Sequence, residues 1–179
     1  MNIFKLFYTP KKIPKFDVKY FHGNSKNVFG VEIEPDNYTE FISKYYKIFQ
    51  SNNIQQNIMT NYKFIKFIEQ RNNLKLKILN IKLTEKDQLI LSQNEIYIDL
   101  IKSLNRRNIK EATEFLKELV EDGFNISTVE CVLEDKNQHR FNIHDNGTIA
   151  FSTSLNDIEK YIKDNFIIDY LCMGILNEE

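Results

Sequence analysis

The chain has 179 residues, of which 42% are hydrophobic and 27% are charged, and its net charge is −1 at pH 7. This length can bury a core without disulfides, and the composition excludes a disordered chain and, with no run of about 20 apolar residues, a transmembrane helix. Because Cys131 and Cys172 are the only cysteines, we expect a cytoplasmic protein without a disulfide framework. From the chain length we expect one domain over residues 1–179.

The first half of the chain mixes strand and helix patterns. Apolar residues at every second position predict a half-buried strand over residues 28–34 and a strand over residues 74–83, and short strands are also expected over residues 2–9 and 17–21. Apolar residues three or four apart predict one helix that starts at Pro35-Asp36 and another over residues 54–71. Asp36 is the candidate N-cap of the first helix. The second has a predicted buried stripe of Ile58, Tyr62, Ile65 and Ile68 or Glu69.

The second half ends in a predicted sheet. Helices are expected over residues 85–92, 94–106 and 109–122, and Gly123 is placed to end the last of them. Strands are expected over residues 127–134, 139–144 and 148–152, with Asn146-Gly147 as a hairpin signal. A helix over residues 155–165 follows, and residues 166–176 fit either a strand or a helix. The predicted fold class is α+β, mainly an antiparallel sheet with several amphipathic helices packed on it.

Catalytic signatures are missing from the sequence. His22, His139 and His144 are scattered, and the last two fall on opposite faces of a predicted strand. The cysteines lie outside any zinc-binding spacing, and the five glycines cannot form a phosphate-binding loop. We therefore expect no metal, no cofactor and no enzymatic activity.

One alternative is a metal-dependent nuclease. An acidic residue, Glu121 or Asp122, precedes a predicted strand that ends at Glu134-Asp135-Lys136. This resembles the PD-(D/E)xK nuclease pattern, in which carboxylates bind a divalent metal and a lysine positions water. The proline of that pattern is missing, and the same residues also describe an ordinary hairpin turn.

The N-terminal region offers a second alternative, a mobile-element regulator that binds nucleic acid. Six lysines alternate with aromatic rings there: Lys5, Lys11, Lys12, Lys15, Lys19 and Lys26 with Phe4, Phe7, Phe16, Tyr20 and Phe21. Lysines suit phosphates and rings suit bases. However, the region has no arginine, and the rings also suit strands packed on a core, so we do not expect nucleic acid as the partner.

Charge is unevenly distributed along the chain. Residues 1–83 hold 14 Lys/Arg and 6 Asp/Glu, whereas residues 84–179 hold 10 and 19. Eight carboxylates fall between positions 111 and 135: Glu111, Glu114, Glu118, Glu121, Asp122, Glu130, Glu134 and Asp135. Those on the predicted helix step by three or four and share one face, where like charges repel. A solvated helix explains this pattern, and the functional alternative is a surface that binds a cationic protein.

The chain resembles the immunity proteins of bacterial polymorphic and contact-dependent toxin systems. The resemblance rests on a small α+β chain without catalytic motifs, a composition rich in Ile, Lys and Asn, the acidic face, and the closing unit of residues 141–151 followed by a helix from Leu155. It implies direct binding of a cognate toxin domain, often a nuclease with a basic cleft. It transfers no residue roles, so the eight carboxylates are the predicted partner-binding residues on charge alone.

Overall fold

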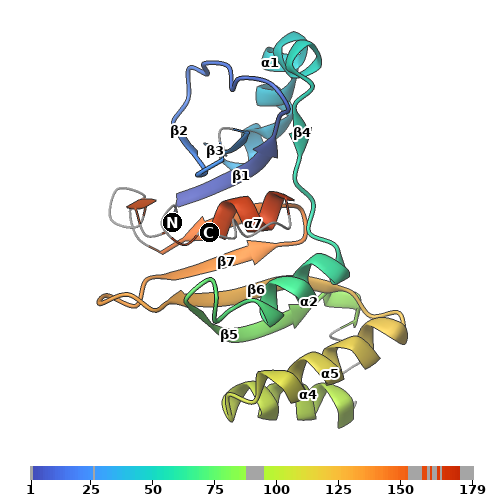
Figure 1. Cartoon of the computed structure of the whole chain (residues 1–179). Helices are drawn as coiled ribbons and strands as arrows, with labels where there is room; N and C mark the ends of the chain where they lie inside the picture. The colour runs from blue at the N-terminus through green and yellow to red at the C-terminus, as the bar shows by residue number, and fades with distance from the viewer. Residues whose placement is uncertain are drawn as a thin grey trace. The chain divides into compact units, whose positions relative to one another are not determined.

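The computed structural model describes residues 2–25, 27–87, 95–152, 159–160, 162, 165 and 167–173. The fold is α+β, as predicted, and the strand pairs that it resolves are antiparallel (Figure 1). Most of the helix expected over residues 155–165, and the end of that over residues 85–92, lie outside the described residues.

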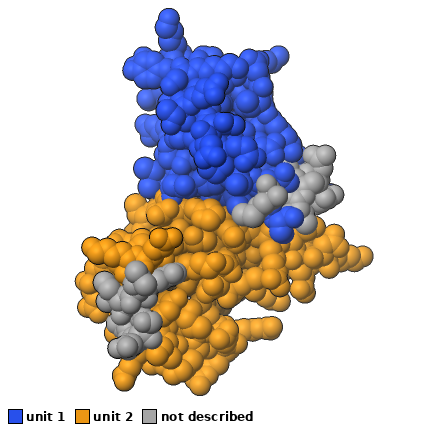
Figure 2. All heavy atoms as spheres, turned by 180° about the vertical axis from the view of Figure 1, so that it is seen from behind, with its two compact units in different colours: residues 1–58, 146–179 blue, residues 59–145 orange. Residues whose placement is uncertain are grey.

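The chain divides into two compact units (Figure 2). Unit 1 contains residues 1–58 and 146–179, and unit 2 contains residues 59–145. No Gly-, Pro- or Ser-rich linker marks either boundary in the sequence. The prediction of one domain over residues 1–179 stays a prediction.

Unit 1 is built on its first strand. β1 (Asn2–Tyr8) pairs with β3 (Val28–Glu32) on one side and with β8 (Thr148–Phe151) on the other. β2 (Tyr20–His22) pairs with β3, and the two-residue β4 (Gln55–Gln56) pairs with the end of β1. β3 was expected to be half-buried, but its residues 28–31 are all buried, so both of its faces are covered.

Aromatic side chains form the core of unit 1. Phe7 stacks on Phe29 with ring centroids 5.5 Å apart, and Phe16 meets Tyr45 edge-on at 5.2 Å. Tyr45 comes from α1 (Tyr38–Asn52), the predicted first helix. Asp36 does not cap α1, because it lies inside a 3₁₀ turn, η1 (Pro35–Asn37), that precedes the helix.

The end of the chain returns to unit 1. The segment that fitted either strand or helix contains a helix, α7 (Ile167–Met173). The side chain of Asp169 is 5% exposed and accepts the backbone N–H groups of Asn24 (2.9 Å) and Ser25 (2.6 Å). This carboxylate therefore ties α7 to the turn between β2 and β3.

A ring and a glycine face each other between β2 and β3. Phe21 pairs directly with Gly30, and a Cβ atom on Gly30 would overlap the Phe21 ring. Phe21 is 3% exposed. Because Gly30 has no side chain, it leaves the space in which the Phe21 ring is buried.

Unit 2 is a three-stranded sheet with helices. β6 (Ile126–Leu133) lies between β5 (Leu76–Leu83) and β7 (Arg140–His144). α2 (Asn61–Glu69) contacts β6, α4 (Glu95–Asn105) contacts β5, and α5 (Ile109–Glu121) contacts both α2 and α4 (Figure 1). Cys131 is fully buried in β6, and burial raises the pKa of its thiol. Cys172, in α7, is half-buried.

β5 contains an irregularity that its alternation did not predict. Its register against β6 shifts between Ile78 and Asn80, so the buried residues change from Leu76 and Ile78 to Ile81 and Leu83. The Asn80 side chain accepts the N–H of Ile81 (3.0 Å). Because β5 is the outer strand of unit 2, the bulge and this bond hinder the addition of another strand.

The second predicted helix is shorter than expected. It begins at Asn61 rather than Ile54, because the side chain of Thr60 caps it and residues 55–56 pair with β1 instead. Its predicted stripe was half wrong, since Ile58 and Tyr62 are 56% and 69% exposed. The buried residues are Phe64, Ile65, Phe67 and Ile68.

Candidate protein-binding surface

α5 forms where the pattern predicted and buries the predicted side. Ile109, Ala112, Leu116 and Leu119 are each at most 7% exposed, while Val120 is half-buried. The Asn108 side chain caps the first turn by accepting the N–H of Glu111 (3.4 Å). At the other end Gly123 takes a φ of +93°, which suits a residue without a Cβ. These contacts fix which face of α5 is left to solvent.

That outer face carries four exposed carboxylates, which we call the acidic face: Glu114, Glu118, Glu121 and Asp122. Within the described part of the chain, no Lys, Arg or His nitrogen lies within 4.0 Å of any of them. Lys117, on the same helix, instead pairs with Glu69 of α2 at 2.8 Å. Lys110 precedes Glu114 by one turn and is exposed, and no ion pair joins the two.

The other four predicted residues each have a partner inside unit 2. Glu111 accepts from the Asn108 amide (2.7 Å), Glu130 pairs with Lys82 (2.5 Å), Glu134 with Lys77 (4.0 Å) and Asp135 with His139 (2.5 Å). Three of these partners come from neighbouring strands or from the β6–β7 turn. Of the eight predicted carboxylates, Glu130 and Glu134 are therefore paired with lysines of β5, Glu111 and Asp135 are hydrogen-bonded, and the four of the acidic face have no ion pair among the described residues.

The acidic face is unfavourable for the helix that carries it. Glu114 and Glu118 are four residues apart and Glu121 is three further on, so their carboxylates repel one another. Glu121 and Asp122 also lie at the C-terminal end of α5, where the helix dipole disfavours negative charge. No basic residue in the last turn offsets them. The negative charge therefore lowers the stability of α5.

The candidate nuclease residues are not brought together. Glu121 and Asp122 precede β6, whereas Glu134 and Lys136 follow it. An eight-residue strand spans roughly 26 Å, and metal-bound carboxylate oxygens lie within about 2.6 Å of the ion. Among the described residues there is no group of three or more His, Cys, Asp or Glu that could hold a metal. This geometry gives the nuclease alternative no support.

The rings of the basic N-terminal region lie in the core. Phe4, Phe7, Phe16 and Phe21 are each at most 7% exposed, so they are not available to stack on bases. Three lysines have partners: Lys5 donates to the carbonyl of Asn146, Lys11 to that of Ser51 (2.5 Å), and Lys19 pairs with Glu32 (3.5 Å). Lys12 and Lys15 are exposed, and Lys26 lies outside the described residues. The burial of these rings and the partners of these lysines favour a role in strand packing over a role in nucleic-acid binding.

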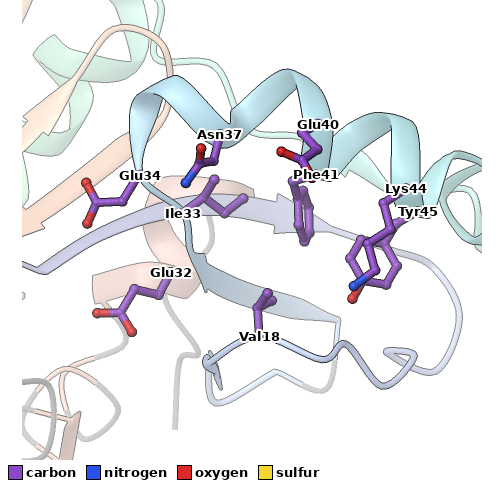
Figure 3. Close-up of a pocket in the computed structure, with 9 residues that line it drawn as sticks. All are labelled: Val18, Glu32, Ile33, Glu34, Asn37, Glu40, Phe41, Lys44 and Tyr45. Carbon is purple, nitrogen blue, oxygen red and sulfur yellow. The ribbon is translucent and has the colours of Figure 1, made fainter.

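A pocket that no sequence pattern indicated opens beside α1 in unit 1 (Figure 3). Its volume is about 350 Å³, and Ile33, Phe41 and Val18 form its apolar wall. Around the rim stand Glu32, Glu34, Glu40, Asn37, Lys44 and Tyr45. Two of the rim charges already have partners, because Glu32 pairs with Lys19 (3.5 Å) and Lys44 with Asp17 (3.7 Å). The remaining rim carboxylates carry less unneutralised charge than the acidic face.

No family model, curated protein or solved structure matches this chain. Among the helices that the structure describes, none has both the length and the apolar character needed to cross a lipid bilayer. A functional assignment therefore depends on the geometry and charge of the candidate surfaces.

Proposed function

We propose that this chain is a non-enzymatic protein-binding module, an immunity protein that neutralises a cognate bacterial toxin by direct binding. The observation that carries the proposal is the acidic face of α5, where four exposed carboxylates lack ion-pair partners among the described residues. Glu130 and Glu134, nearby in unit 2, are paired with lysines of β5, so the acidic face is the part of this carboxylate-rich region that has no ion pairs among the described residues.

The physical role of this face is to attract and orient a cationic partner. A toxin that cleaves nucleic acid has a basic cleft for phosphates, and carboxylates at α5 spacing can occupy the same positions. Opposite charge on two surfaces raises the association rate and excludes wrongly charged partners. Repulsion between Glu114, Glu118 and Glu121 is relieved when a cationic surface covers them, which adds to the binding free energy.

The test uses a toxin domain encoded next to the gene for this chain, purified and titrated with the full-length protein. We expect the triple variant Glu114→Lys, Glu118→Lys, Glu121→Lys to associate at least about tenfold more slowly at low salt. A matched triple, Glu34→Lys, Asp36→Lys and Glu85→Lys, makes the same charge change at exposed positions on other elements. It should slow association less than about twofold.

Two results would overturn parts of this proposal. If the α5 triple variant binds with the affinity and salt dependence of the wild type, the acidic face is not the contact surface. If cells that express the toxin domain are not protected by the wild-type chain, the protein is not its immunity protein. Circular dichroism of both triple variants checks that each is folded.

A further inference from the structure

A pocket also lies in unit 2, and four separate segments of the chain build it. The pocket has a volume of about 340 Å³, within the range of small-ligand sites. The segments are the turn after α2, the start of β5, the turn between α4 and α5, and the residue that follows β6. Its lining consists of Arg71, Asn72, Leu76, Lys77, Ile78, Leu79, Leu104, Asn105, Arg107, Ile109 and Glu134.

The floor of this pocket is apolar. Leu76, Ile78, Leu104 and Ile109 line it, and each is at most 7% exposed. Leu79, beside the β5 bulge, is a large apolar residue that remains 39% exposed. A ligand with an apolar group would cover the exposed part of Leu79 and gain the free energy of burying it.

The rim of the pocket has an excess of positive charge. Arg71, Lys77 and Arg107 line the pocket together with a single carboxylate, Glu134, which lies 4.0 Å from Lys77. No carboxylate of the described chain lies within 4.0 Å of either arginine. Burial lowers the pKa of Arg71, and the charge of Glu134 opposes that shift. A guanidinium stays charged at neutral pH, so a net charge of about +2 surrounds the pocket.

Arg107 is held in a conformation that arginine rarely adopts. Its φ is +59°, in the left-handed region where glycine or asparagine is favoured. The turn fixes it there, because the N–H of Arg107 donates to Leu104 (2.9 Å) and the next N–H donates to Ser103 (2.9 Å). A position that would fold more easily with glycine thus carries a guanidinium at the mouth of a basic pocket.

We propose that this pocket binds a small phosphate monoester with a compact apolar group. A phosphate monoester carries a charge of about −1.5 to −2 at neutral pH, which matches the excess on the rim. Arg71 and Arg107 present planar donor pairs that suit phosphate oxygens, and Lys77 adds a point charge. The apolar group lies against Leu76, Ile78, Leu104 and Ile109. The site is independent of the acidic face, so either proposal can fail alone.

Phenyl phosphate is the probe for this site, titrated into the ¹⁵N-labelled full-length protein at low salt. We expect amide shifts at the pocket residues, and an affinity that falls by about tenfold or more in Arg71→Gln and in Arg107→Gln. Arg106→Gln is the matched control, because Arg106 is exposed, adjoins Arg107 and does not line the pocket. It should weaken binding by less than about twofold.

Arg107→Gly separates loss of binding from loss of fold. It removes the guanidinium while placing the residue that the left-handed backbone prefers. We expect it to keep the wild-type thermal stability and to lose phenyl phosphate binding as Arg107→Gln does. Inorganic phosphate should bind more weakly than phenyl phosphate, because it has no apolar group to cover Leu79 and pack against the apolar lining.

The proposal is overturned if roughly 5 mM phenyl phosphate shifts no amide of the pocket in the wild type. It is also overturned if Arg106→Gln weakens binding as much as Arg107→Gln, because the anion would then bind a diffuse basic surface. Equal affinity for phenyl phosphate and inorganic phosphate would remove the apolar group from the ligand class and so contradict the proposal as stated.

Discussion

Lys117 of α5 lies 2.8 Å from Glu69 of α2, and this ion pair draws one of the two lysines of α5 away from the acidic face. Glu69 also pairs with Lys66 of its own helix at 3.0 Å. The pKa of Glu69 is lowered, first by the hydrogen bond from Lys117. The contact thus joins two helices and leaves Glu114 and Glu118 without their closest cationic neighbour in sequence.

Replacing Lys117 by Met should cost only about 0.2–1 kcal/mol of stability, because both side chains are partly exposed. Because the pKa of Glu69 is lowered in the folded protein, its ionised carboxylate stabilises the fold at pH values above the usual pKa of glutamate. This stabilisation is lost as the pH falls through the lowered pKa of the folded state. The variant should therefore have a lower free energy of unfolding than the wild type at neutral pH, and the two values should converge at acidic pH. NMR titration of Glu69 and urea unfolding measure both effects, and an unchanged Glu69 pKa would contradict the assignment.

Neutralising part of the acidic face should stabilise the protein. In Glu118→Gln with Glu121→Gln, repulsion along α5 and the unfavourable interaction with the helix dipole are both reduced. We expect a gain of about 0.3–1 kcal/mol in the free energy of unfolding, together with slower association with the toxin domain. Urea unfolding measures the first and stopped-flow fluorescence the second. A loss of stability would show that these carboxylates support the fold.

His144 should make stability depend on pH. It faces Thr128 across β6 and β7, with Nδ1 and Oγ1 3.1 Å apart, and burial lowers its pKa from 6.5. The unfolded chain therefore takes up a proton before the folded protein does, so stability falls as pH drops below about 6.5.

His144→Gln removes this proton uptake. Its free energy of unfolding should change less than that of the wild type between about pH 7.5 and pH 5. Urea unfolding across this range measures the difference. His22 is exposed, so His22→Gln is the control and should keep the wild-type slope. Equal slopes for the wild type and His144→Gln would exclude His144 as the titrating group.

Removing the carboxylate of Asp169 should destabilise unit 1. Asp169→Ala leaves the N–H groups of Asn24 and Ser25 without this acceptor, which we expect to cost about 1–3 kcal/mol. Asp169→Asn keeps the shape and one carbonyl oxygen, so its cost should be intermediate. Chemical denaturation of the full chain compares the two variants. Equal stability of Asp169→Ala and the wild type would show that the two bonds contribute nothing.

Local patterns in the sequence predicted the elements that depend on local physics. The stripe from Ile109 to Leu119 and the following Gly123 predicted α5 almost to the residue. Local sequence patterns did not predict β4, because residues 55–56 are extended only through pairing with β1. The bulge in β5 was missed for the same reason, since it is defined by the register against β6.

The candidate surface was half predictable. Spacing alone placed Glu114, Glu118 and Glu121 on one exposed face of a helix. It could not show that Glu130 and Glu134 are neutralised, because their partners Lys82 and Lys77 lie about fifty residues earlier and meet them only through strand pairing. The basic pocket could not be predicted from the sequence for a similar reason, since four segments that are distant in sequence supply its lining.

The contact between Phe21 and Gly30 sets a condition on how this protein can diverge. Any side chain at position 30 would meet the Phe21 ring, and a smaller residue at position 21 alone would leave a void in the core. Homologues should therefore change the two positions together, pairing a larger residue at one with a smaller residue at the other. Covariation at this pair would reveal the β2–β3 register from sequences alone.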